Sequence, residues 1–188
     1  MKKVIIMVLL VVISVSAQYK MTSISATIGK GALSSGYDIS LGFSNGDNTF
    51  QVTGNHTRVF GTFSWDLSPF TVSASGGFFQ NAPWAGPLVV FKPTEYISTM
   101  HWYGMSAGVP DKPGWDVHVL VRYNALSLHV WKFTATFAVS KFLDNEIDYL
   151  PGIKFSDMIN ESWKISVSVD YTVTGATPLF QFGMHHSI

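Results

Sequence analysis

The chain has 188 residues, enough for one domain with one sizeable core. Its 12 basic and 12 acidic residues give a formal net charge of zero, which argues against a nucleic-acid-binding surface of clustered Lys and Arg. Charged residues make up 13% of the chain and hydrophobic residues 47%, whereas charge reaches ~25% in typical soluble domains. The sequence contains no cysteine, which excludes a disulfide framework.

The N-terminus has the pattern of a secretory signal peptide. Two lysines precede an apolar run from Val4 to Val15, and small residues follow before the polar Gln18. The run is shorter than the ~20 residues of a spanning helix. We therefore expect export, with residues 1–17 as the signal peptide and residues 18–188 as one β-domain.

Short runs of alternating apolar and polar residues follow, and this period of two is typical of β-strands. In the first half the runs begin near Ser23, Tyr37, Phe50, Val59 and Phe70. An Asn-Gly pair between the second and third runs predicts a hairpin turn, since both residues accept positive φ. The chain therefore opens with a series of antiparallel strands.

The middle of the chain is less regular. Residues Asn81 to Pro93 contain three prolines and are predicted to form a loop, with room for a short strand at Leu88 to Phe91. Residues Tyr96 to Ala107 are predicted to form a strand. A Pro- and Gly-rich break at Val109 to Gly114 follows, and a further alternating run then begins at Trp115.

The phase of the alternation changes twice in the next segment. Apolar residues hold odd positions up to Tyr123, even positions up to Val130, and odd positions again from Phe133. We interpret the change as a two-residue turn at Asn124-Ala125 followed by a β-bulge near Trp131. This register turns polar side chains inward and predicts an interior charge network formed by Asp116, His118, Arg122 and Lys132.

Residues Lys141 to Ser162 lose the alternation and carry five acids against two lysines. Loops of this kind carry the binding residues of many β-proteins. We expect an exposed loop whose recognition residues are Asp144, Glu146 and Asp148.

Residues Trp163 to Val173 alternate strictly, with large apolar residues at every odd position. Trp163 and Tyr171 bracket this apolar face, as Trp115 and Tyr123 bracket another, and such aromatic belts suit the two interfaces of a membrane. With nine to eleven strand candidates, we predict an all-β fold, an antiparallel up-and-down β-barrel of eight or ten strands with its apolar face toward lipid.

The signal peptide, the alternating strands and the final strand resemble those of small bacterial outer-membrane β-barrel proteins. In that final strand Phe180, Phe182, Met184 and Ile188 keep the alternation, whereas His186 departs from it. The resemblance implies the outer membrane as location, and membrane lipid and a barrel-assembly machinery as partners. It implies a non-enzymatic role as a structural component, a narrow pore or a surface-loop adhesin.

Two alternatives remain open. The first is a soluble periplasmic or extracellular β-sandwich or lipocalin-like binder of an apolar ligand. The second is a barrel lipid hydrolase, because His185 and Ser187 lie two apart on one strand face and faintly resemble the pair of outer-membrane lipid A deacylases. The six histidines lack metal-ligand spacing, so we expect no metal and no cofactor, and the ligand is unknown.

Overall fold

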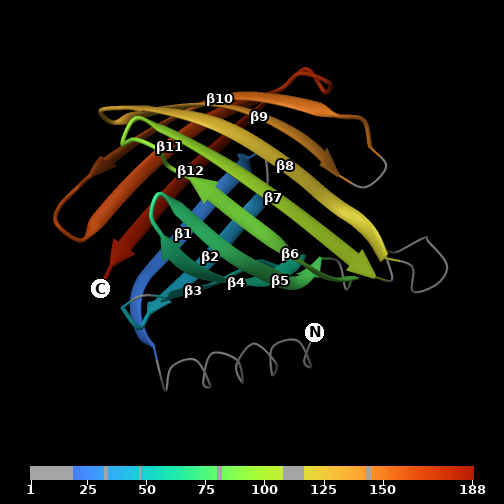
Figure 1. Cartoon of the computed structure of the whole chain (residues 1–188). Coiled ribbons are helices and arrows are strands. Elements are labelled where there is room, and N and C mark those ends of the chain that lie inside the picture. Colours follow the sequence, from blue (N-terminus) through green and yellow to red (C-terminus); the bar gives the residue numbers. More distant parts are fainter. Residues whose placement is uncertain (1–18, 32–33, 47, 80–81, 108–116, 143–144) are drawn as a thin grey trace.

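A closed antiparallel β-barrel accounts for nearly all of the described chain (Figure 1). The computed structural model describes residues 19–31, 34–46, 48–79, 82–107, 117–142 and 145–188. The predicted signal peptide lies outside these residues. The described residues contain no helix that is long and apolar enough to span a membrane.

Twelve strands run up and down around the barrel, and β12 pairs with β1 to close it. They are β1 (Lys20–Gly31), β2 (Ser34–Ser44), β3 (Asn48–Gly54), β4 (Arg58–Leu67), β5 (Phe70–Phe79), β6 (Ala82–Phe91), β7 (Ile97–Ala107), β8 (Val117–Val130), β9 (Phe133–Phe142), β10 (Asp148–Met158), β11 (Trp163–Thr172) and β12 (Thr177–Ser187). The predicted fold class is confirmed, but the predicted number of eight or ten strands is wrong.

Two strands that the sequence did not predict in full contain proline. The segment predicted as a proline-rich loop forms β6, where the pairing with β7 leaves out Gly86 and Pro87. A proline without an N–H is tolerated where the ladder needs no donor. The predicted loop at residues 141–162 contains β10, in which Pro151 pairs with Phe137 of β9. These prolines therefore lie within strands and do not end them.

The two faces of the barrel differ in polarity. On β11, Trp163, Val167 and Tyr171 point outward and are 38%, 46% and 42% exposed. Ser168 and Asp170 of the same strand face the interior. Both faces of this strand match the prediction. Apolar side chains continue the outer belt on other strands, among them Ile24, Ile39, Leu126, Phe137, Ile153, Phe180 and Phe182.

The change of phase before residue 133 has a simpler cause than the predicted bulge. A tight turn at Trp131 and Lys132 joins β8 to β9, with Trp131 at φ 53° and Val130 paired with Phe133. Paired residues lie on the same face, so the parity changes across a two-residue turn without any bulge. The predicted turn at Asn124-Ala125 and the predicted bulge near Trp131 are wrong.

The register shift of β8 lies nearer its start. Gly104 of β7 pairs with Val121, but Met105 pairs with Val119, so Leu120 is left over. This extra residue turns Tyr123 inward, where it is 6% exposed. The predicted place of Tyr123 in an outer aromatic belt is therefore wrong.

The connections at the two barrel ends differ in length. The termini end, where β1 begins and β12 ends, carries the connections at residues 45–47, 68–69, 92–96, 131–132 and 159–162. The opposite end, called the loop end below, carries those at residues 32–33, 55–57, 80–81, 108–116, 143–147 and 173–176. The longest connection, residues 108–116, therefore lies at the loop end.

Candidate functional site

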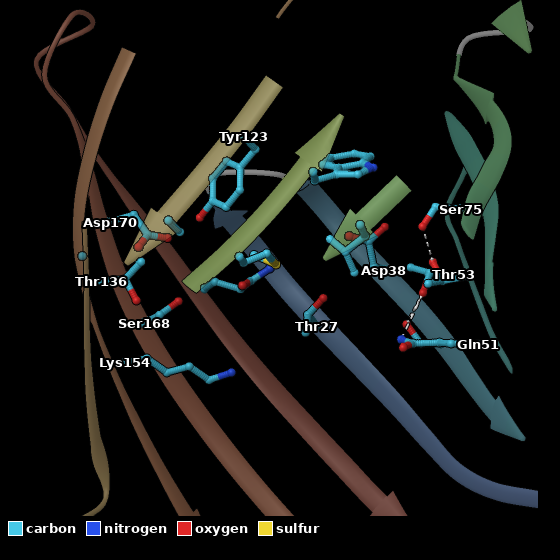
Figure 2. Close-up of a pocket in the computed structure, with 18 of the residues that line it drawn as sticks. Thr27, Asp38, Gln51, Thr53, Ser75, Tyr123, Thr136, Lys154, Ser168 and Asp170 are labelled. Atoms are coloured by element: carbon cyan, nitrogen blue, oxygen red, sulfur yellow. Dashed lines mark hydrogen bonds between the residues drawn. The ribbon is translucent and has the colours of Figure 1, made fainter. Parts of the chain in front are cut away.

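The barrel encloses a cavity of about 530 Å³ with both polar and apolar lining residues, called the lumen cavity below. Figure 2 shows Ser168 and Asp170 on one side of this space and Thr53 and Ser75 on the other. Small inward side chains in a twelve-stranded barrel leave this space open, since barrel diameter grows with strand number. The interior is therefore not filled by packing.

Hydroxyl groups pair between neighbouring strands along the lumen wall. Their oxygens lie 2.8–3.1 Å apart in the pairs Ser40–Thr53, Thr62–Ser75, Ser64–Ser73 and Ser127–Thr136. Each pair satisfies two polar side chains without a long side chain. This part of the wall is thus hydrophilic, and its short side chains leave room at the centre of the barrel.

An ion pair bridges two strands of this wall. The Arg58 guanidinium of β4 donates from Nη2 to Asp38 Oδ2 of β2 at 2.5 Å and from Nε to Asp38 Oδ1 at 3.3 Å. The Asn55 amide donates to the same Oδ1 at 2.9 Å. Asn55 Oδ1 in turn accepts from the Arg58 backbone N–H at 3.1 Å. These bonds hold the β3–β4 turn against β2 at the loop end.

A second pair of charges lies on β10 and β11. Lys154 and Asp170 both line the lumen cavity (Figure 2). A Cβ atom on Gly152 would clash with Asp170 Oδ1, so the glycine makes room for this carboxylate. The described residues that line the cavity thus include two acids, Asp38 and Asp170, and two bases, Arg58 and Lys154. Their formal charges cancel.

Aromatic and apolar side chains form another part of the wall, on β4, β6, β7 and β8. The ring centroids of Phe60 and Trp84 lie 5.7 Å apart, and those of Trp84 and Trp102 lie 5.3 Å apart. Tyr123 lines the same cavity. We call Phe60, Trp84, Trp102 and Tyr123 the aromatic wall.

Sequence reasoning missed the aromatic wall. Trp84 falls in the segment predicted as a loop, and Tyr123 falls on the strand whose phase depends on Leu120. Trp102 and Met100 do lie two apart in a predicted strand, which is the one local signal for a shared face. Residue type alone does not tell an inner aromatic from an outer one in a barrel.

Of the predicted interior network of Asp116, His118, Arg122 and Lys132, the structure describes the side chains of Arg122 and Lys132, and these two do not lie together. Asp116 lies outside the described residues, and the backbone of His118 pairs with Ser106, while its side chain is not described. Arg122 is exposed on the outer face, because Leu120 shifts the register before it. Lys132 lies in a turn at the termini end and binds Asp157 at 2.6 Å. The described members therefore lie apart.

Two of the three predicted recognition residues lie together at the loop end. Glu146 and Asp148 line a second cavity of about 550 Å³ with Asn145 and Thr174. Thr174 donates its backbone N–H to Asp148 Oδ1 at 3.1 Å. Asp148 is the first residue of β10 and not a loop residue, and Asp144 lies outside the described residues.

The predicted pair of His185 and Ser187 lies at the termini end. Ser187 Oγ is 3.3 Å from His185 Nε2, in an exposed position. A hydrolase also needs a third group that orients the histidine, and the register places Lys164 opposite His185. The described part of the chain contains no cluster of three His, Cys, Asp or Glu residues that could hold a metal ion. The geometry gives no support to hydrolase chemistry here.

Comparison with known proteins finds solved structures with the same fold. No protein-family model matches the chain, and no curated protein sequence matches it. Two solved structures, "KdgM porin in complex with disordered oligogalacturonate" and "KdgM porin", share the fold with a TM-score of 0.56 at 12% and 11% identity. Each match covers 90% of this chain and 99% of the porin chain. The chain therefore has the β-barrel fold of porins.

A mutant porin of Rh. blastica also matches, with a TM-score of 0.48 and 11% identity. This match covers 81% of the chain and 55% of that porin.

Proposed function

We propose that this chain forms a narrow pore in an outer membrane and passes small, uncharged hydrophilic solutes. The observation that carries the proposal is that polar and apolar side chains are distributed in the opposite way to a soluble protein. A cavity lined by hydroxyl, amide and charged side chains beside the aromatic wall lies inside a closed barrel, and large apolar side chains cover the outside. Membrane barrels of the porin type have this arrangement.

The outer belt supports the membrane location. Ile28, Val130 and Phe180 are each at least 60% exposed on the outer face. Soluble monomers rarely expose apolar patches larger than a few hundred Å², whereas lipid solvates such a belt. A soluble binder of an apolar ligand would need the reverse, an apolar interior under a polar exterior.

The lining of the lumen supports the proposal that the solutes are uncharged and have both polar and apolar faces. Sugars are such a class. Hydroxyl-bearing side chains on one part of the wall suit solute hydroxyls, and the aromatic wall suits the C–H faces of a ring. One of the KdgM structures is a complex with oligogalacturonate, which is a polyanion. The described lining here carries Asp38 and Asp170 against Arg58 and Lys154, so it has no positive excess to attract one.

Planar-bilayer recording of the refolded mature protein tests the pore. We expect discrete single-channel currents, with anion and cation permeabilities close to each other because the lining charges balance. Liposome swelling should be faster with a neutral disaccharide than with an oligogalacturonate of similar length. Absence of channels from protein shown to be folded would contradict the pore, and faster uptake of the polyanion would contradict the solute class.

Narrowing the lumen provides a matched test. Ser168→Trp places an indole in the lumen cavity and should reduce the conductance severalfold. Val169→Trp places the same side chain on the outer face of the same strand and should leave the conductance near that of the wild type. Equal conductances of the two variants would show that current does not pass through this lumen.

The loop end is proposed to face the cell exterior, because outer-membrane barrels carry short periplasmic turns and longer external loops. An epitope inserted after Asn145 should then be reached by antibody on intact cells. The same epitope after Gly46, in a turn at the termini end, should be reached only after permeabilisation. The opposite pattern would mean that the barrel is oriented the other way. Any recognition by Glu146 and Asp148 would take place on the exposed end.

The proposed partners follow from the same placement. Membrane lipid would surround the outer belt. A barrel-assembly machinery would insert the chain, for which Phe180, Phe182 and Met184 supply an outward apolar row on β12.

A further inference from the structure

One region of the outer face is polar. On β7, β8 and β9, five outward side chains lie beside one another in the register: His101, Tyr103, Arg122, Asn124 and Lys141. We call these residues the basic patch. Elsewhere the outer face is dominated by exposed aliphatic and aromatic side chains. Polar and charged side chains that face lipid cost free energy, so we expect a bound partner to cover the basic patch.

The two cations of the basic patch repel each other. Arg122 of β8 pairs directly with Lys141 of β9, and both side chains are exposed. Like charges opposite each other in a sheet are destabilising. Within the described residues neither Arg122 nor Lys141 forms an ion pair, unlike Arg58, which binds Asp38, and Lys132, which binds Asp157. An anion between the two cations would relieve the repulsion.

The hydrogen bonds of His101 and Tyr103 orient the Asn124 side chain in the basic patch. Asn124 Oδ1 accepts from the Tyr103 hydroxyl at 3.3 Å and lies 2.8 Å from His101 Nδ1. Because Oδ1 is an acceptor, His101 Nδ1 carries the proton in this contact. The amide oxygen is thus occupied, and the Asn124 amide nitrogen remains available as a donor beside Arg122. A guanidinium, an ammonium and an amide N–H together suit the oxygens of a phosphate group.

The surroundings of the basic patch favour a lipid over a second copy of this chain. Toward the termini end lie Leu126, Leu128 and Phe137, 47%, 48% and 50% exposed, which form an apolar shelf for acyl chains. A second copy of the chain would need an outward acidic side chain at the same level of the barrel to pair with Arg122 and Lys141. The outward acid described on the strands is Asp157, which lies near the termini end and is bound to Lys132.

We infer that the basic patch binds the phosphate of a phosphorylated lipid in the membrane leaflet at the loop end, with acyl chains on the apolar shelf. Arg122 and Lys141 would hold the phosphate between them, and Asn124 would add a hydrogen bond. This inference depends on the proposed membrane location but not on the pore. Loss of conductance would leave it untouched.

Native mass spectrometry of the detergent-solubilised mature protein tests the inference, with bisphosphorylated lipid A as the probe. The double variant R122S/K141S should bind the lipid roughly tenfold or more weakly than the wild type, since each basic residue contributes to binding an anionic lipid surface. Lys30→Ser is the matched control, because Lys30 lies on the outer face at the loop end of β1, on the far side of the barrel. It should bind like the wild type.

Two further measurements separate the sources of phosphate. Dephosphorylated lipid A should bind the wild type no better than it binds the double variant. Inorganic phosphate at the concentration of the lipid should not displace it, because phosphate lacks the acyl chains. Equal lipid binding by wild type and double variant, an equal loss with Lys30→Ser, or displacement by inorganic phosphate would each overturn the inference. Heat-modifiable migration on a denaturing gel confirms that every variant is folded.

Discussion

Replacing Val167 by Arg should lower the free energy of unfolding in a bilayer by about 2–4 kcal/mol, the cost of an Arg at the bilayer midplane on a barrel's lipid face. Val167 lies in the middle of β11 and is 46% exposed on the outer face. Urea titration of the protein in vesicles, followed by Trp fluorescence, measures this free energy. The expected loss is large because the guanidinium leaves water for hydrocarbon.

Ser168→Arg is the control for this substitution. Ser168 is the next residue of the same strand and faces the lumen cavity, where water solvates the new charge. We expect a smaller loss of stability and a change in conductance. In a water-soluble barrel an exposed Val167 could become Arg at little cost, because surface substitutions usually change stability by less than about 0.5 kcal/mol. A small effect of Val167→Arg would therefore contradict the membrane location.

Removing the Asp38 carboxylate should lower the free energy of unfolding by about 3 kcal/mol, because it leaves a partly buried cation unpaired. The side chains of Arg58 and Asp38 are 16% and 7% exposed, so water screens this pair less than a surface ion pair. The variant Asp38→Ala also leaves the Asn55 amide without its acceptor. Urea titration in vesicles measures the loss.

A double variant and a surface control complete this test. Replacing the pair together, as in D38L/R58M, should restore part of the stability, since an apolar pair leaves no unpaired charge. Asp66→Ala removes an exposed acid near the termini end and should change stability little. If D38L/R58M and Asp38→Ala were equally destabilised, the loss would come from packing and not from the unpaired charge.

The sequence alone determined the fold class and the inner and outer faces of the most regular strand. Along Trp163 to Tyr171 the apolar positions turned out to be the outward ones. This could be predicted because alternation is a property of the strand itself, whatever its neighbours are. The hairpin turn at Asn45-Gly46 was predictable for a similar reason, since Gly46 adopts a φ of 104°, which glycine accepts freely.

Only the tertiary structure decided the number of strands, the phase of β8 and the residues that meet in the lumen. Pro87 and Pro151 signal a loop locally, yet the ladders around them tolerate a missing donor. The extra residue Leu120 is visible only against its partner strand, because one added residue turns every following side chain to the other face. It moved Tyr123 into the lumen and Arg122 onto the outer face. Which side chains share the lumen depends on pairing between distant strands and on where the barrel closes, and neither is a local property of the chain.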